Sequence, residues 1–180
     1  RAWYASKEKT LGEDMKREYP SIPSEAFAQS VEGAYYSNQF KKLYADKRIC
    51  KLPDNSHLPV NTAWDIGVGD STAIWFFRLV GNEIHIIDFY ENSGEGLRHY
   101  MTVLKKKGYS YDRHYGPHDL NNKEFGSDAK SRAEIAREGY EIDGVKYKLK
   151  FDVLPRGGID DGIEQAREIL PRCVFDEDKC

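Results

Sequence analysis

The stretch Thr62–Phe77, TAWDIGVGDSTAIWFF, sets the pattern for the whole chain. It begins as a strand and, after two glycines, continues as an apolar run that is typical of a second, buried strand. Asp65 interrupts the first strand, and alternation places it on one sheet face with the small residues Ala63 and Gly67, which leaves room for a ligand. A carboxylate buried in a strand needs a compensating charge or a metal ion. The other acidic residues of the chain therefore decide what Asp65 does.

The pattern on either side of this stretch predicts an α/β fold. Three strands come first, with Gly81-Asn82 as a hairpin turn between the second and third, and helices and strands then alternate. The expected strands are 63–68, 73–80, 84–90, 111–116 and 147–154, and the expected helices are 96–107, 129–138 and 161–170. The order β-β-β-α-β-α-β-α predicts a mixed sheet of three antiparallel strands followed by alternating elements, flanked by helices.

Length and composition suggest one globular domain with an extension. The chain has 180 residues, 39% of them hydrophobic, and a net charge of −3, so its overall charge does not indicate a nucleic-acid binder. Four prolines and a short amphipathic helix over 38–51 make 1–59 a connecting region, and 60–180 is the expected domain. Three scattered cysteines favour a reducing compartment, and no apolar run approaches the roughly 20 residues that span a membrane.

Acidic residues recur where the expected elements meet loops. Asp119 follows the fourth strand, and Asp160 and Asp161 open the last helix. If the first and fourth strands are neighbours, Asp65 and Asp119 approach each other and repel unless a cation lies between them. Carboxylates without histidine or cysteine pairs select a hard divalent ion such as Mg²⁺ or Mn²⁺. The alternative is that Asp119 is a turn residue and that the helix acids only favour the helix dipole.

Several other residues have two interpretations. Asp70 is either a turn acid or an auxiliary ligand, and Asp88 makes either a local hydrogen bond or part of a site. His118 is either packed or orients the carboxylate of Asp119. Three basic residues lie either on a solvated surface or against DNA phosphates: Lys130, Arg132 and Arg156.

Four segments together resemble the nuclease domain of the large terminase subunit of tailed bacteriophages and prophages. They are WDIGVGDSTAIWFF, HIIDFYENSGEGLRHY, YGPHDLNNKEFGS and IDDGIEQAREILPRCVFDEDKC. The upstream EYPSIPSEAFAQSVEGAYYSNQF is similar to the segment that joins the packaging ATPase of that family to its nuclease. The resemblance covers nearly the whole chain, and it is the order and spacing of the segments that carry it.

The resemblance implies a ribonuclease-H-like fold and a two-metal endonuclease that cuts concatemeric viral double-stranded DNA during packaging. By matching motifs, Asp65 would bridge two divalent cations, Mg²⁺ or Mn²⁺, with Asp119 and Asp161 as the other main ligands. Asp160 and Asp70 would be auxiliary acids, and a helical wheel leaves the choice between Asp160 and Asp161 open. Implied partners are the ATPase domain, the terminase small subunit and the portal, in the cytoplasm of the infected bacterium.

The chain departs from that family in one respect, because it contains no G-x-x-x-x-G-K-[ST] phosphate loop. Translocation therefore cannot be performed by these residues alone, and we expect 1–59 to join an ATPase that the sequence lacks. Two further interpretations remain. One is a DNA-clamping or docking module of the packaging motor without catalysis. The other is a sugar- or acetate-kinase-like fold, which needs a second copy of the fold that 180 residues do not supply.

Overall fold

The computed structural model describes residues 35–67, 71–123 and 129–180. The chain divides after Asp46 into two units. The described part of the first contains one helix, α4 (Ser37–Ala45), in which Leu43 is buried. The second unit runs from Lys47 to Cys180 and holds the sheet. Among the described residues, no helix is both long and apolar enough to cross a membrane.

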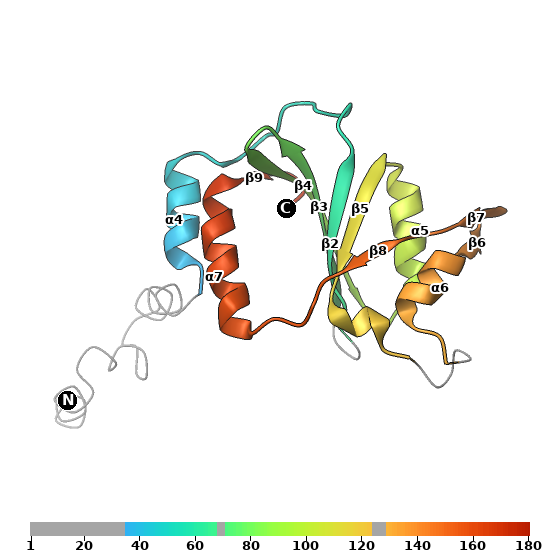
Figure 1. The fold of residues 1–180 in the computed structure, drawn as a ribbon. Coiled ribbons are helices and arrows are strands. Elements are labelled where there is room, and N and C mark those ends of the chain that lie inside the picture. The colour runs from blue at the N-terminus through green and yellow to red at the C-terminus, as the bar shows by residue number, and fades with distance from the viewer. Residues whose placement is uncertain (1–34, 68–70, 124–128) are drawn as a thin grey trace, which may run out of the picture. The chain divides into compact units, whose positions relative to one another are not determined.

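A seven-stranded mixed sheet forms the centre of the second unit, in the order β1-β9-β4-β3-β2-β5-β8 (Figure 1). Its strands are β1 (Ile49–Cys50), β2 (Val60–Asp65), β3 (Ser71–Val80), β4 (Glu83–Ser93), β5 (Tyr111–Gly116), β8 (Phe151–Val153) and β9 (Cys173–Asp176). The antiparallel meander β2-β3-β4 confirms the prediction for the start of the domain. β2 and β5 are parallel neighbours, as expected for the first and fourth strands.

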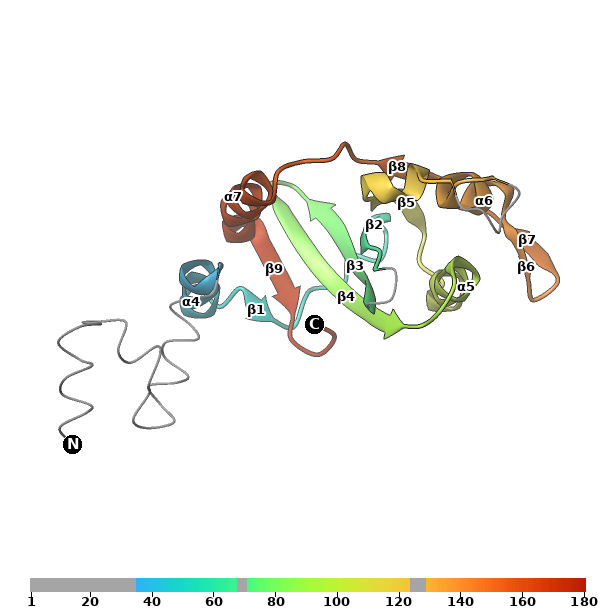
Figure 2. The same ribbon diagram turned by 90° about the horizontal axis from the view of Figure 1, so that it is seen from below.

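Two helices cover one face of this sheet. In α5 (Leu97–Lys107) the side chains of Tyr100, Met101 and Leu104 are buried, and Gly108 ends the helix in the left-handed conformation that was expected of a C-cap. α6 (Arg132–Glu138) begins with a capping box. Figures 1 and 2 show both helices beside β5 and β8, and their buried residues share one core cluster with the strands: Val60, Trp64, Ile74, Phe76, Ile87, Tyr100, Met101, Leu104, Leu120, Ala133, Ala136, Ile142, Leu149 and Phe151.

The region after α6 differs from the prediction of one strand over 147–154. Asp143-Gly144, both with positive φ, closes a hairpin of β6 (Tyr140–Ile142) and β7 (Val145–Tyr147), which lies outside the main sheet. An Asp-Gly pair favours this kind of two-residue turn, so the signal was present in the sequence. β8 consequently shortens to three residues before the last helix, α7 (Ile159–Ile169). The short strands β1 and β9 were also not predicted.

A buried polar chain links β2 and β5. The Trp64 Nε1–H donates to Thr62 Oγ1 over 2.8 Å, and Thr62 Oγ1 lies 2.7 Å from His114 Nδ1. His114 is only 7% exposed, and burial lowers its pKa to about 4. The imidazole is therefore neutral in the folded protein at pH 7 and ties the two strands that lead to the candidate site.

His114 should make the fold sensitive to acid. Below pH 6.5 the unfolded chain protonates this imidazole, whereas the folded chain does so only near pH 4. The free energy of unfolding should therefore fall as the pH drops from about 6.5 to 4, by at most roughly 3 kcal/mol from this residue. Urea unfolding at pH 7 and at pH 4.5 measures the loss. His114→Gln should lose less over the same interval, and an equal loss in both proteins would contradict this origin.

Candidate active site

Three neighbouring parallel strands end at one edge of the sheet, and an acidic residue follows each of them. β5 pairs in parallel with β2 on one side and with β8 on the other. Asp65 is the last residue of β2, and Asp119 lies in the short 3₁₀ helix η1 (His118–Asn121) after β5. Asp160 and Asp161 form the first turn of α7, which follows β8. This edge is the lower one in Figure 1.

Asp65 is exposed, so the expectation that it sits buried within a strand was wrong. β2 ends at this residue instead of continuing to 68, and its carboxylate keeps its contact with water. Its cross-strand partner is the small Ala73, whose partner on the next strand is Glu91. Glu91 therefore shares a sheet face and a row with Asp65. Sequence reasoning missed Glu91, because only the register of β3 against β4 reveals it.

Asp119 has its contacts within its own turn. His118 Nε2 lies 3.2 Å from Asp119 Oδ1, and the Asn122 side-chain amide donates to the same oxygen over 3.0 Å. The carboxyl side chain is 49% exposed. The next residue, Leu120, is fully buried and fixes the turn to the core. One carboxylate oxygen is therefore held in place while the group remains accessible from solvent.

Gly116 allows η1 to approach β5 closely. A Cβ at this position would clash with Leu120 Cδ1 and would lie 3.2 Å from Phe151 Cδ1. We expect Gly116→Ala to lower the free energy of unfolding by about 1–3 kcal/mol, as overpacking does, and to displace the turn that carries Asp119. Thermal unfolding measures the first effect. Gly157→Ala is a matched control, because a Cβ at Gly157 meets nothing within 4 Å, and equal melting temperatures for the two variants would contradict the close-packing argument.

The structure does not bring the acids of α7 to the other two. Among the residues that it describes, no three histidine, cysteine, aspartate or glutamate side chains are grouped closely enough to hold one metal ion. Asp160 and Asp161 are both exposed, and Asp161 Oδ2 lies 3.0 Å from where a Cβ on Gly158 would be, so this carboxylate turns back toward the helix start. Asp70 lies outside the described residues.

The three basic candidates lie on two segments near this edge. Lys130 Nζ contacts both carboxylate oxygens of Glu138, at 2.7 and 2.8 Å, just before and at the end of α6. Arg132 is the first residue of α6 and is half-buried. Arg156 is exposed in the loop 154–158 that leads to α7.

Asp88 belongs to the core and not to this edge. Its carboxylate accepts hydrogen bonds from Lys107 Nζ, from the Tyr109 hydroxyl at 2.9 Å and from the Phe89 backbone N–H at 2.9 Å. Lys107 also lies 5.0 Å above the ring of Phe76. Burial and the neighbouring carboxylate raise the pKa of Tyr109 to about 12, so the hydroxyl remains a donor. The local hydrogen bond considered for Asp88 exists, within a larger buried cluster.

Comparison with known proteins gives matches in structure alone. No protein-family model and no curated protein sequence matches the chain. The large terminase of a thermophilic bacteriophage aligns with a TM-score of 0.51 at 12% identity, over 74% of this chain and 33% of that one. The P22 large terminase nuclease domain gives 0.47 at 14% identity, over 74% and 70%. The large terminase nuclease domain from bacteriophage SPP1 with bound Mn gives 0.43 at 14% identity, over 67% and 62%.

The match to the terminase of the thermophilic bacteriophage confirms the expected α/β fold, although this chain spans only a third (33%) of that protein. At 12% identity the likeness concerns the fold alone. The order of elements found here, an antiparallel meander followed by parallel strands and crossover helices, agrees with it. The chain thus has the ribonuclease-H-like fold that is found in the large terminases of bacteriophages.

Proposed function

We propose that the chain is an endonuclease that cleaves concatemeric viral double-stranded DNA while the genome is packaged into the capsid. The observation that carries this proposal is the acidic residue after each of three adjacent parallel strands, in a ribonuclease-H-like sheet. Phosphodiester hydrolysis at such an edge needs groups that neutralise charge on the scissile phosphate, and three carboxylates alone would repel it. The acids therefore point to a cation-dependent reaction.

Two divalent cations, Mg²⁺ or Mn²⁺, are the proposed cofactors. The donor chemistry fits hard ions, because the edge offers carboxylates and no cysteine or histidine pair. Asp65 and Asp119 would hold them, with Asp161 as the third main ligand and Asp160 and Asp70 in support. When bound, such ions activate a water molecule and stabilise the leaving oxygen.

The remaining roles fall to this chain's own side chains. His118, 3.2 Å from Asp119 Oδ1, orients that carboxylate in the proposal. Lys130, Arg132 and Arg156 contact DNA phosphates, which would make binding weakly dependent on sequence and strongly dependent on salt. The Lys130–Glu138 pair is exposed, and such pairs contribute little, so a phosphate can compete for the ammonium group.

We further propose that the chain is one part of a larger motor. Residues 1–59 would join the nuclease domain, 60–180, to an ATPase domain, and the terminase small subunit and the portal would be further partners. The site of action would be the cytoplasm of the infected bacterial cell.

Cleavage of supercoiled plasmid tests the activity. We expect nicked and then linear DNA in the presence of Mn²⁺ or Mg²⁺, and no product when EDTA removes the ion. Binding of the same plasmid, measured at several salt concentrations, should weaken steeply as salt rises. Intact plasmid with either ion, under conditions in which the protein binds DNA, would contradict the proposal.

A second candidate is a DNA-clamping or docking module of the packaging motor that does not cut. It is favoured by one observation: the described acidic side chains do not gather into a three-ligand group. The plasmid assay separates the two candidates, because the module would bind DNA with the same salt dependence and leave it intact.

A further inference from the structure

The face of the sheet opposite α5 and α6 is apolar and only partly covered. We call it the second face, and it carries Trp75, Phe77 and Leu79 of β3, Ile86 and Phe89 of β4, Tyr115 of β5 and Phe175 of β9. Trp75 contacts Phe89, with ring centroids 4.4 Å apart, and Phe77 stacks with Tyr115 at 6.3 Å. Trp75 is nevertheless 38% exposed and Leu79 is 56% exposed. Exposed apolar area of this kind on a sheet calls for a covering element.

α7 has an apolar side that is equally uncovered. Ile159, Ile163, Ala166 and Leu170 recur at helical spacing along one side. None of the eleven residues of α7 is buried, none belongs to a core cluster, and Ile159 is 83% exposed. In α5, by contrast, the corresponding apolar side is buried against the sheet.

The topology assigns α7 to the second face. The chain moves across the sheet from β4 to β5 through α5 and from β5 to β8 through α6, and it returns in the opposite direction from β8 to β9 through α7. Parallel crossovers are right-handed in nearly all proteins, so a return in the opposite direction lies on the opposite face. Figure 1 shows α7 on the other side of the sheet from α5 and α6. The second face and the apolar side of α7 therefore belong to one crossover unit.

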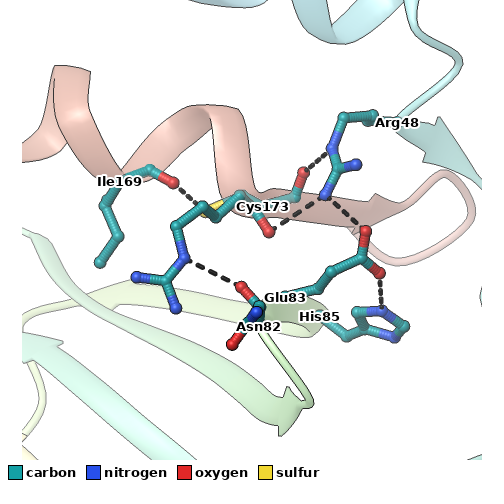
Figure 3. Close-up of polar contacts among 7 residues, drawn as sticks. Arg48, Asn82, Glu83, His85, Ile169 and Cys173 are labelled. Carbon is teal, nitrogen blue, oxygen red and sulfur yellow. Dashed lines mark hydrogen bonds and ion pairs between the residues drawn. The ribbon is translucent and has the colours of Figure 1, made fainter.

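The two ends of α7 are held differently. At its C-terminal end, Arg48 Nε donates to the Cys173 carbonyl over 2.9 Å, and Arg172 Nε donates to the Asn82 carbonyl over 2.9 Å (Figure 3). Glu83 binds Arg48 as well, at 3.0 Å. At its N-terminal end the chain enters through the exposed loop 154–158, which ends in two glycines. The end that carries Asp160 and Asp161 is thus the one with freedom to move.

We propose that α7 docks its apolar side on the second face, and that docking carries its first-turn acids to the sheet edge where Asp65 and Asp119 lie. The role given to these acids rests on the proposed nuclease function, whereas the docking itself does not. Like charges oppose the approach of the two pairs of carboxylates, and a divalent cation removes this opposition. The arrangement described here is the undocked one, and Mg²⁺ shifts the population toward the docked one.

Hydrogen exchange of the full chain with and without Mg²⁺ tests the docking. We expect the amides of α7 to exchange several-fold more slowly with Mg²⁺, while those of α5 change little. A second readout is acrylamide quenching in a Trp3→Phe background, in which Trp64 is buried and Trp75 is 38% exposed. Mg²⁺ should reduce the quenching of Trp75. Unchanged α7 exchange together with unchanged quenching would overturn the proposal.

Two variants of α7 provide matched controls. Ile163→Asp places a charge on the apolar side and should abolish both Mg²⁺ effects, whereas Gln165→Asp places the same charge on an exposed position of another side and should preserve them. Full Mg²⁺ protection in Ile163→Asp would also overturn the proposal. The outcomes separate the two claims: docking without plasmid cleavage contradicts only the nuclease function, and cleavage without docking contradicts only this inference.

Discussion

Asp65→Asn is expected to abolish cleavage of supercoiled plasmid in Mg²⁺ and Mn²⁺, with a loss of at least about 10³-fold, the scale on which removal of one charge-stabilising group acts in hydrolytic sites. In the proposed site this carboxylate bridges both cations, so the neutral amide removes a ligand from each. The fold should remain intact, because Asp65 is exposed at the end of β2 and its removal relieves repulsion. Plasmid cleavage and thermal unfolding of the same preparations measure the two effects.

Asp54→Asn is a suitable control for that variant. Asp54 is also an exposed aspartate of the second unit, and its contact is with the Ser56 backbone N–H at 2.9 Å, in the loop before β2. We expect cleavage at the wild-type rate. Asp65→Asn that cuts plasmid as fast as Asp54→Asn would remove Asp65 from the proposed machinery.

Lys107→Met is expected to destabilise the fold by roughly 3 kcal/mol, because it leaves the carboxylate of Asp88 buried without its countercharge. Asp88 is 7% exposed, and only the Tyr109 hydroxyl and the Phe89 N–H would remain as its partners. Urea unfolding at pH 7 measures the change. The residual hydrogen bonds and the 23% exposure of the Lys107 side chain keep the loss at the lower end of that for buried pairs.

The neighbouring Lys106 supplies the comparison for this effect. It is exposed on the same turn of α5, so Lys106→Met removes an equal charge and preserves helix propensity. Its unfolding free energy should stay within about 0.5 kcal/mol of wild type, as for most surface substitutions. Similar losses in the two variants would show that the Asp88 cluster does not hold α5 to the sheet.

The meander and the alternating elements could be predicted because their local signals agree. Continuous apolar runs mark β3 and β4, and Gly108 ends α5 where its apolar period ends. β1 and β9 were missed because each is only two to four residues long and is defined by a partner far along the chain. The exposure of Asp65 was missed for a related reason: a run of strand-forming residues does not say where the ladder of hydrogen bonds stops.

The candidate site shows the same division between local and distant information. Residue type and spacing identified the acids that follow the strands, and adjacency of β2 and β5 was inferred correctly. Glu91 could not be found in this way, since its place beside Ala73 follows from a register that contains an irregularity at Phe76 and Phe77. Nor could the sequence give the position of α7, because its apolar side fits a docked and an undocked helix equally well.

Anomalous scattering from crystals of the protein grown with Mn²⁺ would test the central claim most directly, because it locates the ions independently of any activity. The account predicts two manganese peaks at the edge formed by the ends of β2 and β5, both within coordination distance of Asp65, with Asp119 and a first-turn acid of α7 completing the site. The absence of ordered manganese at Asp65 and Asp119, in crystals that bind it elsewhere or not at all, would contradict it.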